Sequence, residues 1–129
     1  MIVYLSVDQV LFLHELQLDR FGGSRGLRDQ GGLESAVARP AMTFAGEDLY
    51  PDIAAKAAGL MHSLVMNHPF VDGNKRVGIS AAELFFELNG ARLDSPDKDL
   101  EELTLSVARG EMDAESLAIW FRQRLERTD

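Results

Sequence analysis

Apolar residues recur every three or four positions along most of the chain, which is the spacing of amphipathic helices. The first such segment spans about residues 6–20. Ser6 followed by Gln9 predicts a capping box at its start. Residues 1–5 form a short strand or an extended lead before it. The positions that share the apolar face of this helix are Val7, Val10, Leu11, His14 and Leu18.

Glycine and proline divide the next part of the chain. Five glycines between residues 22 and 32 predict a mobile loop. A short helix is expected at about 32–39, ended by Pro40 because the residue before a proline disfavours helical backbone. Residues 43–51, with the sequence TFAGEDLYP, are expected to be irregular.

Two helices are predicted in the middle of the chain, separated by a break at residues 68–73. Asp52 caps the first, at about 52–67. The second spans about 74–89 and stops at Gly90, the usual residue just beyond a helix. Its residues are apolar nearly all round, which is typical of a central, buried helix.

The C-terminal part predicts two more helices. Ser95 and Pro96 indicate the cap and first turn of a helix at about 96–108, and Asp113 indicates the cap of the last one. An inward stripe follows in that last helix, made of Leu117, Trp120, Phe121 and Leu125. The pattern as a whole predicts a compact all-α bundle of five to six helices with at most a small β flap.

Length and composition indicate one ordinary globular domain, covering residues 1–129. The chain is 46% hydrophobic and 26% charged. It contains no cysteine, which excludes disulfides and thiolate metal sites and fits a reducing compartment.

The charge and the apolar runs bear on partners and location. A net charge of −8 argues against direct nucleic-acid binding, because phosphate backbones need a basic surface. The apolar N-terminal residues 1–5 lack the basic region of a signal peptide, and no apolar run approaches the ~20 residues of a membrane span. We therefore expect a cytoplasmic protein that makes no contact with a membrane.

The segment His68–Arg76, HPFVDGNKR, gathers the chemistry of the chain at the start of a helix. Unpaired N–H groups and the helix dipole favour an anion there. Gly73 lets the backbone approach a ligand, Asn74 adds a donor, and Lys75 and Arg76 add positive charge. This set suits a polyphosphate such as that of ATP.

Two further residues of the segment suit a transfer reaction. Asp72 could bind Mg²⁺ that accompanies the polyphosphate, and His68 could remove a proton from an attacking hydroxyl. The same residues also fit a plain structural interpretation. In that case Asp72 is a helix cap, His68 ends the preceding helix, and Lys75 and Arg76 are solvated. The residue types alone leave both interpretations open.

The segment resembles the core motif of the Fic/Doc family, His-x-Phe-x-(Asp/Glu)-(Gly/Ala)-Asn-(Gly/Lys)-Arg, at every specified position. Residues 32–40 resemble the family segment before the target-binding flap, residues 85–90 resemble the end of the motif helix, and residues 103–119 resemble the tail of death-on-curing toxins. The resemblance implies the family's helical fold over nearly the whole chain.

The resemblance implies a role for each position of the motif. His68 is the base and Phe70 the apolar anchor of the loop. Asp72 is the Mg²⁺ ligand. The phosphate groups of ATP are held by Gly73, Asn74, Lys75 and Arg76.

Position 75 distinguishes two branches of the family. Lys75 resembles the death-on-curing toxins, for which the resemblance implies transfer of the γ-phosphate of ATP to a threonine of elongation factor Tu. Pro69 and Gly73 resemble the branch that transfers AMP to a protein hydroxyl. A module that binds an anion or a partner without catalysis is the third alternative.

The resemblance also implies partners. An antitoxin with a disordered C-terminal segment is expected to fold onto an apolar groove, with the helices at 6–20 and 52–67 as candidates. Residues 43–51 are expected to bind the target backbone as an added strand. His14 and His62 lack metal-ligand spacing and are expected to be helix-face or core residues.

Overall fold

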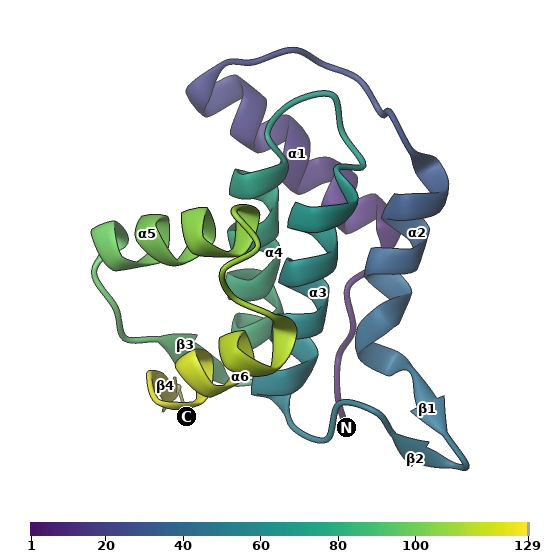
Figure 1. Cartoon of the computed structure of the whole chain (residues 1–129), viewed down its shortest axis with the longest axis vertical. Helices are drawn as coiled ribbons and strands as arrows, with labels where there is room; N and C mark the ends of the chain where they lie inside the picture. The colour runs from purple at the N-terminus through teal and green to yellow at the C-terminus, as the bar shows by residue number, and fades with distance from the viewer. Residues whose placement is uncertain (129) are drawn as a thin grey trace.

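Two antiparallel helices of 15 residues form the centre of the molecule. A computed structural model describes residues 1–128. Helix α3 (Ile53–Asn67) begins at Asp52, whose carboxylate accepts a hydrogen bond from the Ala55 N–H at 2.8 Å. Helix α4 (Asn74–Leu88) packs along α3 after the short connection at residues 68–73 (Figure 1). The expected caps and breaks therefore place both helices where the sequence predicts them.

Helix α3 is the buried central helix, whereas the sequence pattern assigned that place to α4. Ten of the 15 residues of α3 are buried, including the charged Lys56. Helix α4 buries one face and exposes Lys75, Arg76, Glu83 and Glu87 to solvent. The reason is that four other helices of the bundle pack on α3, which leaves little of it open to water, although Met66 near its C-terminal end is 40% exposed.

The two central helices approach closely at Gly78. A Cβ atom built on Gly78 would lie 2.7 Å from Cγ2 of Val65 and 3.5 Å from the carbonyl oxygen of Met61. Valine is stiff at χ1, so Val65 cannot easily turn away from an added methyl group. Gly78 therefore sets the separation of α3 and α4 next to the motif.

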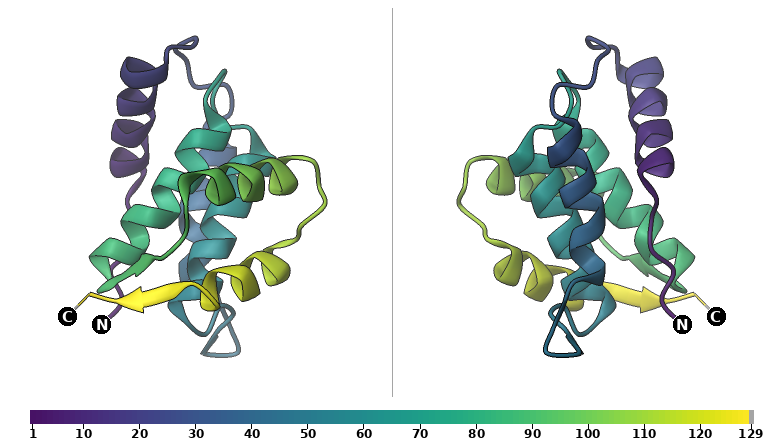
Figure 2. Two further views of the ribbon diagram at one scale, coloured as in Figure 1. Left: turned by 90° about the vertical axis from the view of Figure 1, so that its left-hand side faces the viewer. Right: turned by 90° about the vertical axis from the view of Figure 1, so that its right-hand side faces the viewer.

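Four helices surround this pair (Figures 1 and 2). Helix α1 (Val7–Phe21) starts with the predicted capping box of Ser6 and Gln9 and packs on α4. Helix α2 (Gln30–Ala38) starts two residues earlier than expected, because Asp29 caps it, and continues into the short 3-10 helix Arg39–Ala41. Helices α2 and α5 lie on opposite sides of the α3–α4 pair.

The C-terminal part differs from the prediction at the start of the first helix and at the end of the last one. Helix α5 (Asp97–Ala108) is preceded by Pro96 as the cap residue, rather than Ser95. Helix α6 (Ala114–Arg122) is capped by Asp113 and ends before Leu125. Leu125 instead pairs with Leu93, because strand β4 (Leu125–Arg127) runs antiparallel to β3 (Ala91–Leu93).

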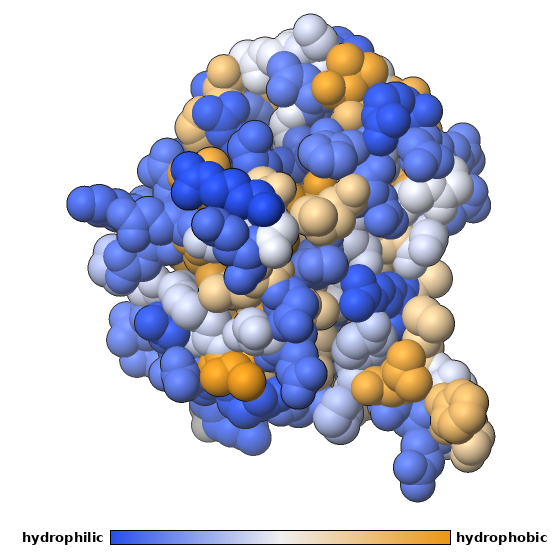
Figure 3. Space-filling model, viewed as in Figure 1, coloured by the Kyte–Doolittle hydropathy of each residue, from blue (hydrophilic) through white to orange (hydrophobic). Residues whose placement is uncertain are grey.

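Residues 43–51 contain a short hairpin rather than a purely irregular segment. Strand β1 (Thr43–Phe44) pairs with β2 (Glu47–Asp48) through the turn Ala45–Gly46. Three apolar side chains around it are exposed: Met42 at 49%, Phe44 at 75% and Leu49 at 47%. Figure 3 shows apolar side chains on the surface of the hairpin.

The hairpin and the motif lie at opposite ends of α3 (Figure 1). The hairpin precedes the first residue of α3 and His68 follows its last. A helix of 15 residues is about 22 Å long. The structure thus confirms an all-α fold with small β elements, and it separates the hairpin from the motif by the length of one helix. Within residues 1–128, none of the helices has the length and hydropathy needed to cross a membrane.

Candidate active site

His68 closes helix α3 in an unusual backbone conformation. Its φ and ψ are 47° and 54°, in the left-handed region, where a residue with a Cβ atom costs about 1–2 kcal/mol. The only other non-glycine residue with a positive φ among residues 1–128 is Ala45, in the hairpin turn. The side chain of His68 is exposed. His68 is therefore both the end of α3, as the structural interpretation holds, and an accessible imidazole.

Phe70 anchors the motif loop in the core, as the resemblance implies. Its side chain is 2% exposed. The ring stacks on the imidazole of His14, with 3.7 Å between ring centroids and 9° between the ring planes. His14 Nε2 also donates to the carbonyl oxygen of Asp72 at 2.8 Å, since a carbonyl can only accept. His14 is thus a core histidine that supports the loop from α1.

Asn74 folds the loop back on itself. Its Oδ1 accepts from the Phe70 N–H and its Nδ2 donates to the Phe70 carbonyl, each at 2.9 Å. The amide oxygen and one amide N–H are therefore used within the loop. Asn74 still has two donors for a ligand: its second side-chain amide N–H and its backbone N–H. The backbone N–H lies in the first turn of α4, where N–H groups have no partner within the helix.

Asp72 is exposed and is held by two backbone N–H groups. Oδ1 accepts from Gly73 at 2.9 Å, and Oδ2 accepts from Ser24 at 3.2 Å. Gly73, not Asp72, is the cap residue of α4, and no side chain caps that helix end. The alternative of Asp72 as a conventional helix cap is therefore wrong, and the first turn of α4 is open to an anion.

The carboxylate of Asp72 fits a Mg²⁺ ion that is shared with a polyphosphate. Each oxygen retains lone-pair capacity beyond its one hydrogen bond. Within residues 1–128 no group of three or more histidine or acidic side chains is arranged to hold a metal by itself. Mg²⁺ commonly takes one or two carboxylates and completes its shell with phosphate oxygens and water, which this donor set allows.

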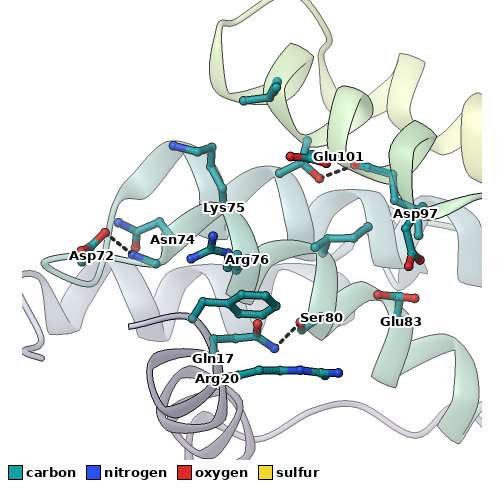
Figure 4. Close-up of a pocket in the computed structure, with 16 residues that line it drawn as sticks. Gln17, Arg20, Asp72, Asn74, Lys75, Arg76, Ser80, Glu83, Asp97 and Glu101 are labelled. Atoms are coloured by element: carbon teal, nitrogen blue, oxygen red, sulfur yellow. Dashed lines mark hydrogen bonds between the residues drawn. The ribbon is translucent and has the colours of Figure 1, made fainter. Parts of the chain in front are cut away.

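A cavity of about 700 Å³ adjoins the start of α4 (Figure 4). It lies between the C-terminal end of α1, the exposed face of α4, and helix α5. Asp72, Gly73, Asn74, Lys75 and Arg76 line one end of it, so five of the six predicted site residues meet in one cavity. His68 is not among the described residues that line it.

The two ends of the cavity carry opposite charge. Lys75 and Arg76 lie toward the motif (Figure 4), and the guanidinium of Arg76 stacks over Phe21 at 4.2 Å from the ring centroid. Glu83 and Asp97 lie at the other end. Partial desolvation, followed by the nearby charges of Asp97 and Glu87, raises the pKa of Glu83, although its side chain still reaches solvent.

Several residues that shape the site lie outside the motif, in the glycine-rich segment 22–29. The segment is fastened to the motif loop by hydrogen bonds from the Ser24 N–H to Asp72 and from the Val71 N–H to the Gly26 carbonyl, and Leu27 bridges to Phe70. The glycines predicted a loop there. No feature of the local sequence shows that this loop packs on the motif.

Known proteins are similar in sequence to this chain over the motif and over most of its length. The model of the Fic/DOC family matches residues 4–86, which include the whole motif. A protein named Toxin Doc from Mycolicibacterium smegmatis is 42% identical over 118 residues, which cover 89% of this chain and 88% of that protein. Protein kinase doc from Escherichia phage P1 is 31% identical over 121 residues, which cover 93% of this chain and 94% of that protein. The chain belongs to the Fic/DOC family.

Proposed function

We propose that this protein is the toxin of a toxin–antitoxin system and that it transfers the γ-phosphate of ATP to a hydroxyl group of a translation factor. The observation that carries the proposal is the open, cationic start of α4 beside Asp72, at the mouth of a cavity large enough for a nucleotide. The names of the two relatives, a toxin and a protein kinase, support the biological setting.

The residues would divide the reaction as follows. The first-turn N–H groups of α4, with Lys75 and Arg76, would hold the phosphate charge. Asp72 would hold Mg²⁺, which supplies further neutralisation of that charge when bound. His68 would accept the proton of the attacking hydroxyl. The hydroxyl oxygen would form a bond to the γ-phosphorus as the bond from that phosphorus to the β-γ bridging oxygen breaks, and ADP would leave.

The position of His68 favours transfer to a large acceptor. The side chain of His68 is exposed and is not among the residues that line the cavity. A protein hydroxyl can approach it from solvent while the nucleotide occupies the cavity. The resemblance of Lys75 to the death-on-curing branch makes a threonine of elongation factor Tu our proposed acceptor.

Transfer of AMP is the second candidate, because Pro69 and Gly73 resemble the AMP-transferring branch. Incubation of the protein with α-labelled or γ-labelled ATP and purified elongation factor Tu distinguishes the two. We expect γ-label on the acceptor. An α-label would establish AMP transfer instead, and label in neither experiment would favour a module that binds without catalysis.

The variant Lys75→Gly sharpens that test. Removal of the lysine side chain opens space at the cavity wall that the AMP-transferring branch leaves free, so we expect part of the product to carry AMP. The mass added to the acceptor measures the change. If the added mass stays that of phosphate alone, another feature sets the orientation of the nucleotide.

An antitoxin is the partner that this function requires. Of the two helices suggested for its docking, α3 is buried, whereas α1 exposes Phe12 at 64%, Leu16 at 45% and Phe21 at 53%. We therefore propose α1 as the site on which the antitoxin segment folds. Expression of the chain alone should arrest growth, and co-expression of a neighbouring small protein should restore it. Unaffected growth despite abundant intact protein would count against a toxin.

A further inference from the structure

His68 combines a left-handed backbone with the side chain that the proposed reaction uses as its base. Glycine is the usual residue where a helix ends in this conformation, because it has no Cβ atom. A side chain at such a position persists only where the surroundings hold the backbone in place. The contacts that hold His68 therefore bear directly on where its imidazole stands.

The guanidinium group of Arg28 makes these contacts. Its Nε and Nη2 donate to the carbonyl oxygen of His68 at 2.9 and 2.6 Å, and Nη2 also donates to the carbonyl oxygen of Asn67 at 3.1 Å. Both oxygens lie at the C-terminal end of α3, where carbonyl groups lack helical partners and attract positive charge. A planar guanidinium can bind two adjacent acceptors at once.

The backbone around Arg28 is paired with the motif loop. The N–H groups of Arg28 and Asp29 donate to the Pro69 carbonyl oxygen at 2.7 and 2.9 Å, and the Val71 N–H donates to Gly26 at 3.0 Å. The side chain of Arg28 therefore starts from a segment whose distance from His68 is already set.

A second arginine of the same loop has different contacts. The guanidinium of Arg25 binds the carboxylates of Glu15 and Asp19 on α1. Arg25 thus fastens the loop to α1, and Arg28 fastens it to the end of α3. Because both side chains leave the same exposed loop, Arg25 is a matched control for Arg28.

We propose that Arg28 is a positioning residue for His68. By binding the carbonyl oxygens of Asn67 and His68, it keeps the His68 backbone left-handed and fixes the direction in which the imidazole leaves the chain. Without Arg28 the imidazole remains, but its direction varies. The consequence for transfer rests on the proposed function, whereas the backbone conformation of His68 can be measured without any transfer.

NMR of the whole protein tests this inference, because the chain has three histidines and their imidazole signals can be assigned by single substitutions. The coupling between the amide and α protons of His68 reports its φ angle. In Arg28→Gln we expect this coupling and the His68 imidazole signals to change, with those of His62 unchanged. Arg28→Lys, which retains the charge but not the fork, should restore them in part. Arg25→Gln should leave His68 as in the wild type.

Kinetics with ATP and the protein acceptor give the second measurement. Arg28→Gln should lower kcat about tenfold or more, because a small misplacement of a reacting group is costly, while KM for ATP stays unchanged. Wild-type His68 signals in Arg28→Gln, or an equal change in Arg25→Gln, would overturn the inference. If Arg28→Gln does not fold, unchanged His68 signals in Arg28→Lys overturn it. A wild-type protein that transfers nothing would refute the proposed function and leave the NMR result valid.

Discussion

The two ends of helix α3 carry the motif loop and the hairpin, and these two segments are held in different ways. At the C-terminal end the motif loop is tied by backbone and side-chain hydrogen bonds from α1, from the segment 22–29 and from its own Asn74. At the N-terminal end the hairpin is exposed at nearly every residue from 41 to 51.

One buried cation links the hairpin to α3. Lys56, which is 1% exposed, donates to Asp48 at 3.1 Å and to the Pro40 carbonyl oxygen at 3.3 Å, and its Nζ lies 5.5 Å from the ring centroid of Tyr4. Burial disfavours its charge, but the neighbouring Tyr4 and the carboxylate of Asp48 outweigh this effect and raise the pKa of Lys56.

On the proposed function, this difference would correspond to a division between chemistry at the motif loop and docking at the hairpin. The motif loop has many independent contacts, as a site that must hold a base and an anion in fixed positions requires. The hairpin has few, and its exposed Phe44 can adapt to a partner. Because about 22 Å of helix lies between them, a target bound by the hairpin must present its hydroxyl at a matching distance.

The largest effect is expected at His68. His68→Ala should lower transfer by about 10²–10⁴-fold, because a general base contributes that much, and should leave ATP affinity unchanged. Initial rates and calorimetry measure the two quantities. Phe44→Ala is the counterpart at the other end of α3, and it should raise KM for the protein acceptor alone. If both variants lowered the same parameter, chemistry and docking would not be separate.

Asp72→Ala should have the next largest effect. Loss of the carboxylate removes the proposed Mg²⁺ ligand and the acceptor for Ser24, so Mg²⁺-dependent ATP affinity should fall by about tenfold or more. Calorimetry with and without Mg²⁺ measures this, and Asp97→Ala at the far end of the cavity serves as the control. Equal Mg²⁺–ATP affinity in Asp72→Ala and the wild type would refute the assignment.

A smaller effect is expected from Lys56→Met, which releases the hairpin. The unfolding free energy of this variant should differ from that of the wild type by only about 1–2 kcal/mol. Asp48 is half exposed and stays solvated without its partner, and methionine fills a volume similar to that of lysine. KM for the protein acceptor should rise about threefold to tenfold, as expected for the loss of one docking contact of about 1 kcal/mol. Lys98→Met, on the exposed face of α5, is the control.

The pH dependence of this contact follows from the raised pKa of Lys56. A raised folded-state pKa means that the charged form stabilises the fold fully below its ordinary value of 10.5 and that this contribution is lost as the pH rises through the folded pKa. The hairpin contact is therefore complete at neutral pH. If the KM for the protein acceptor changed between pH 6 and 8 in the wild type but not in Lys56→Met, this conclusion would be contradicted.

The smallest effect is expected at Ala45, the second non-glycine residue with a positive φ. Asparagine tolerates this conformation better, and Asn-Gly is a favoured hairpin turn, so Ala45→Asn should stabilise the hairpin by less than about 1 kcal/mol. Hydrogen exchange of the Leu49 amide, which donates to Met42, is the measurement. Faster exchange in the variant would show that the turn is not strained.

The features that could be predicted from the sequence are local ones. Ser6 with Gln9, Asp52 and Asp113 each bind within three residues, so their caps follow from the order of residues along the chain. The motif was recognised for a similar reason, since nine consecutive residues contain it. The chain's membership in the Fic/DOC family is confirmed, whereas the roles of the motif residues remain predictions.

The features that could not be predicted join distant residues. Leu125 was placed in a helix by its spacing, but its pairing with Leu93 decides its structure. Asn74 was expected to face a ligand, and its amide is largely occupied by Phe70. Arg28 lies 40 positions before His68, and only the packing of the loop brings the two together.

The close approach at Gly78 makes the tolerance of this chain to mutation uneven. Exposed positions of α4, such as Glu87, face solvent. At Gly78 even alanine would push against Val65 and wedge α4 away from α3. Because His68 ends one of these helices and the anion site begins the other, such a change would alter the distance between them. Gly78, two positions beyond Arg76, is therefore expected to set the spacing of the candidate site without itself taking part in binding or proton transfer.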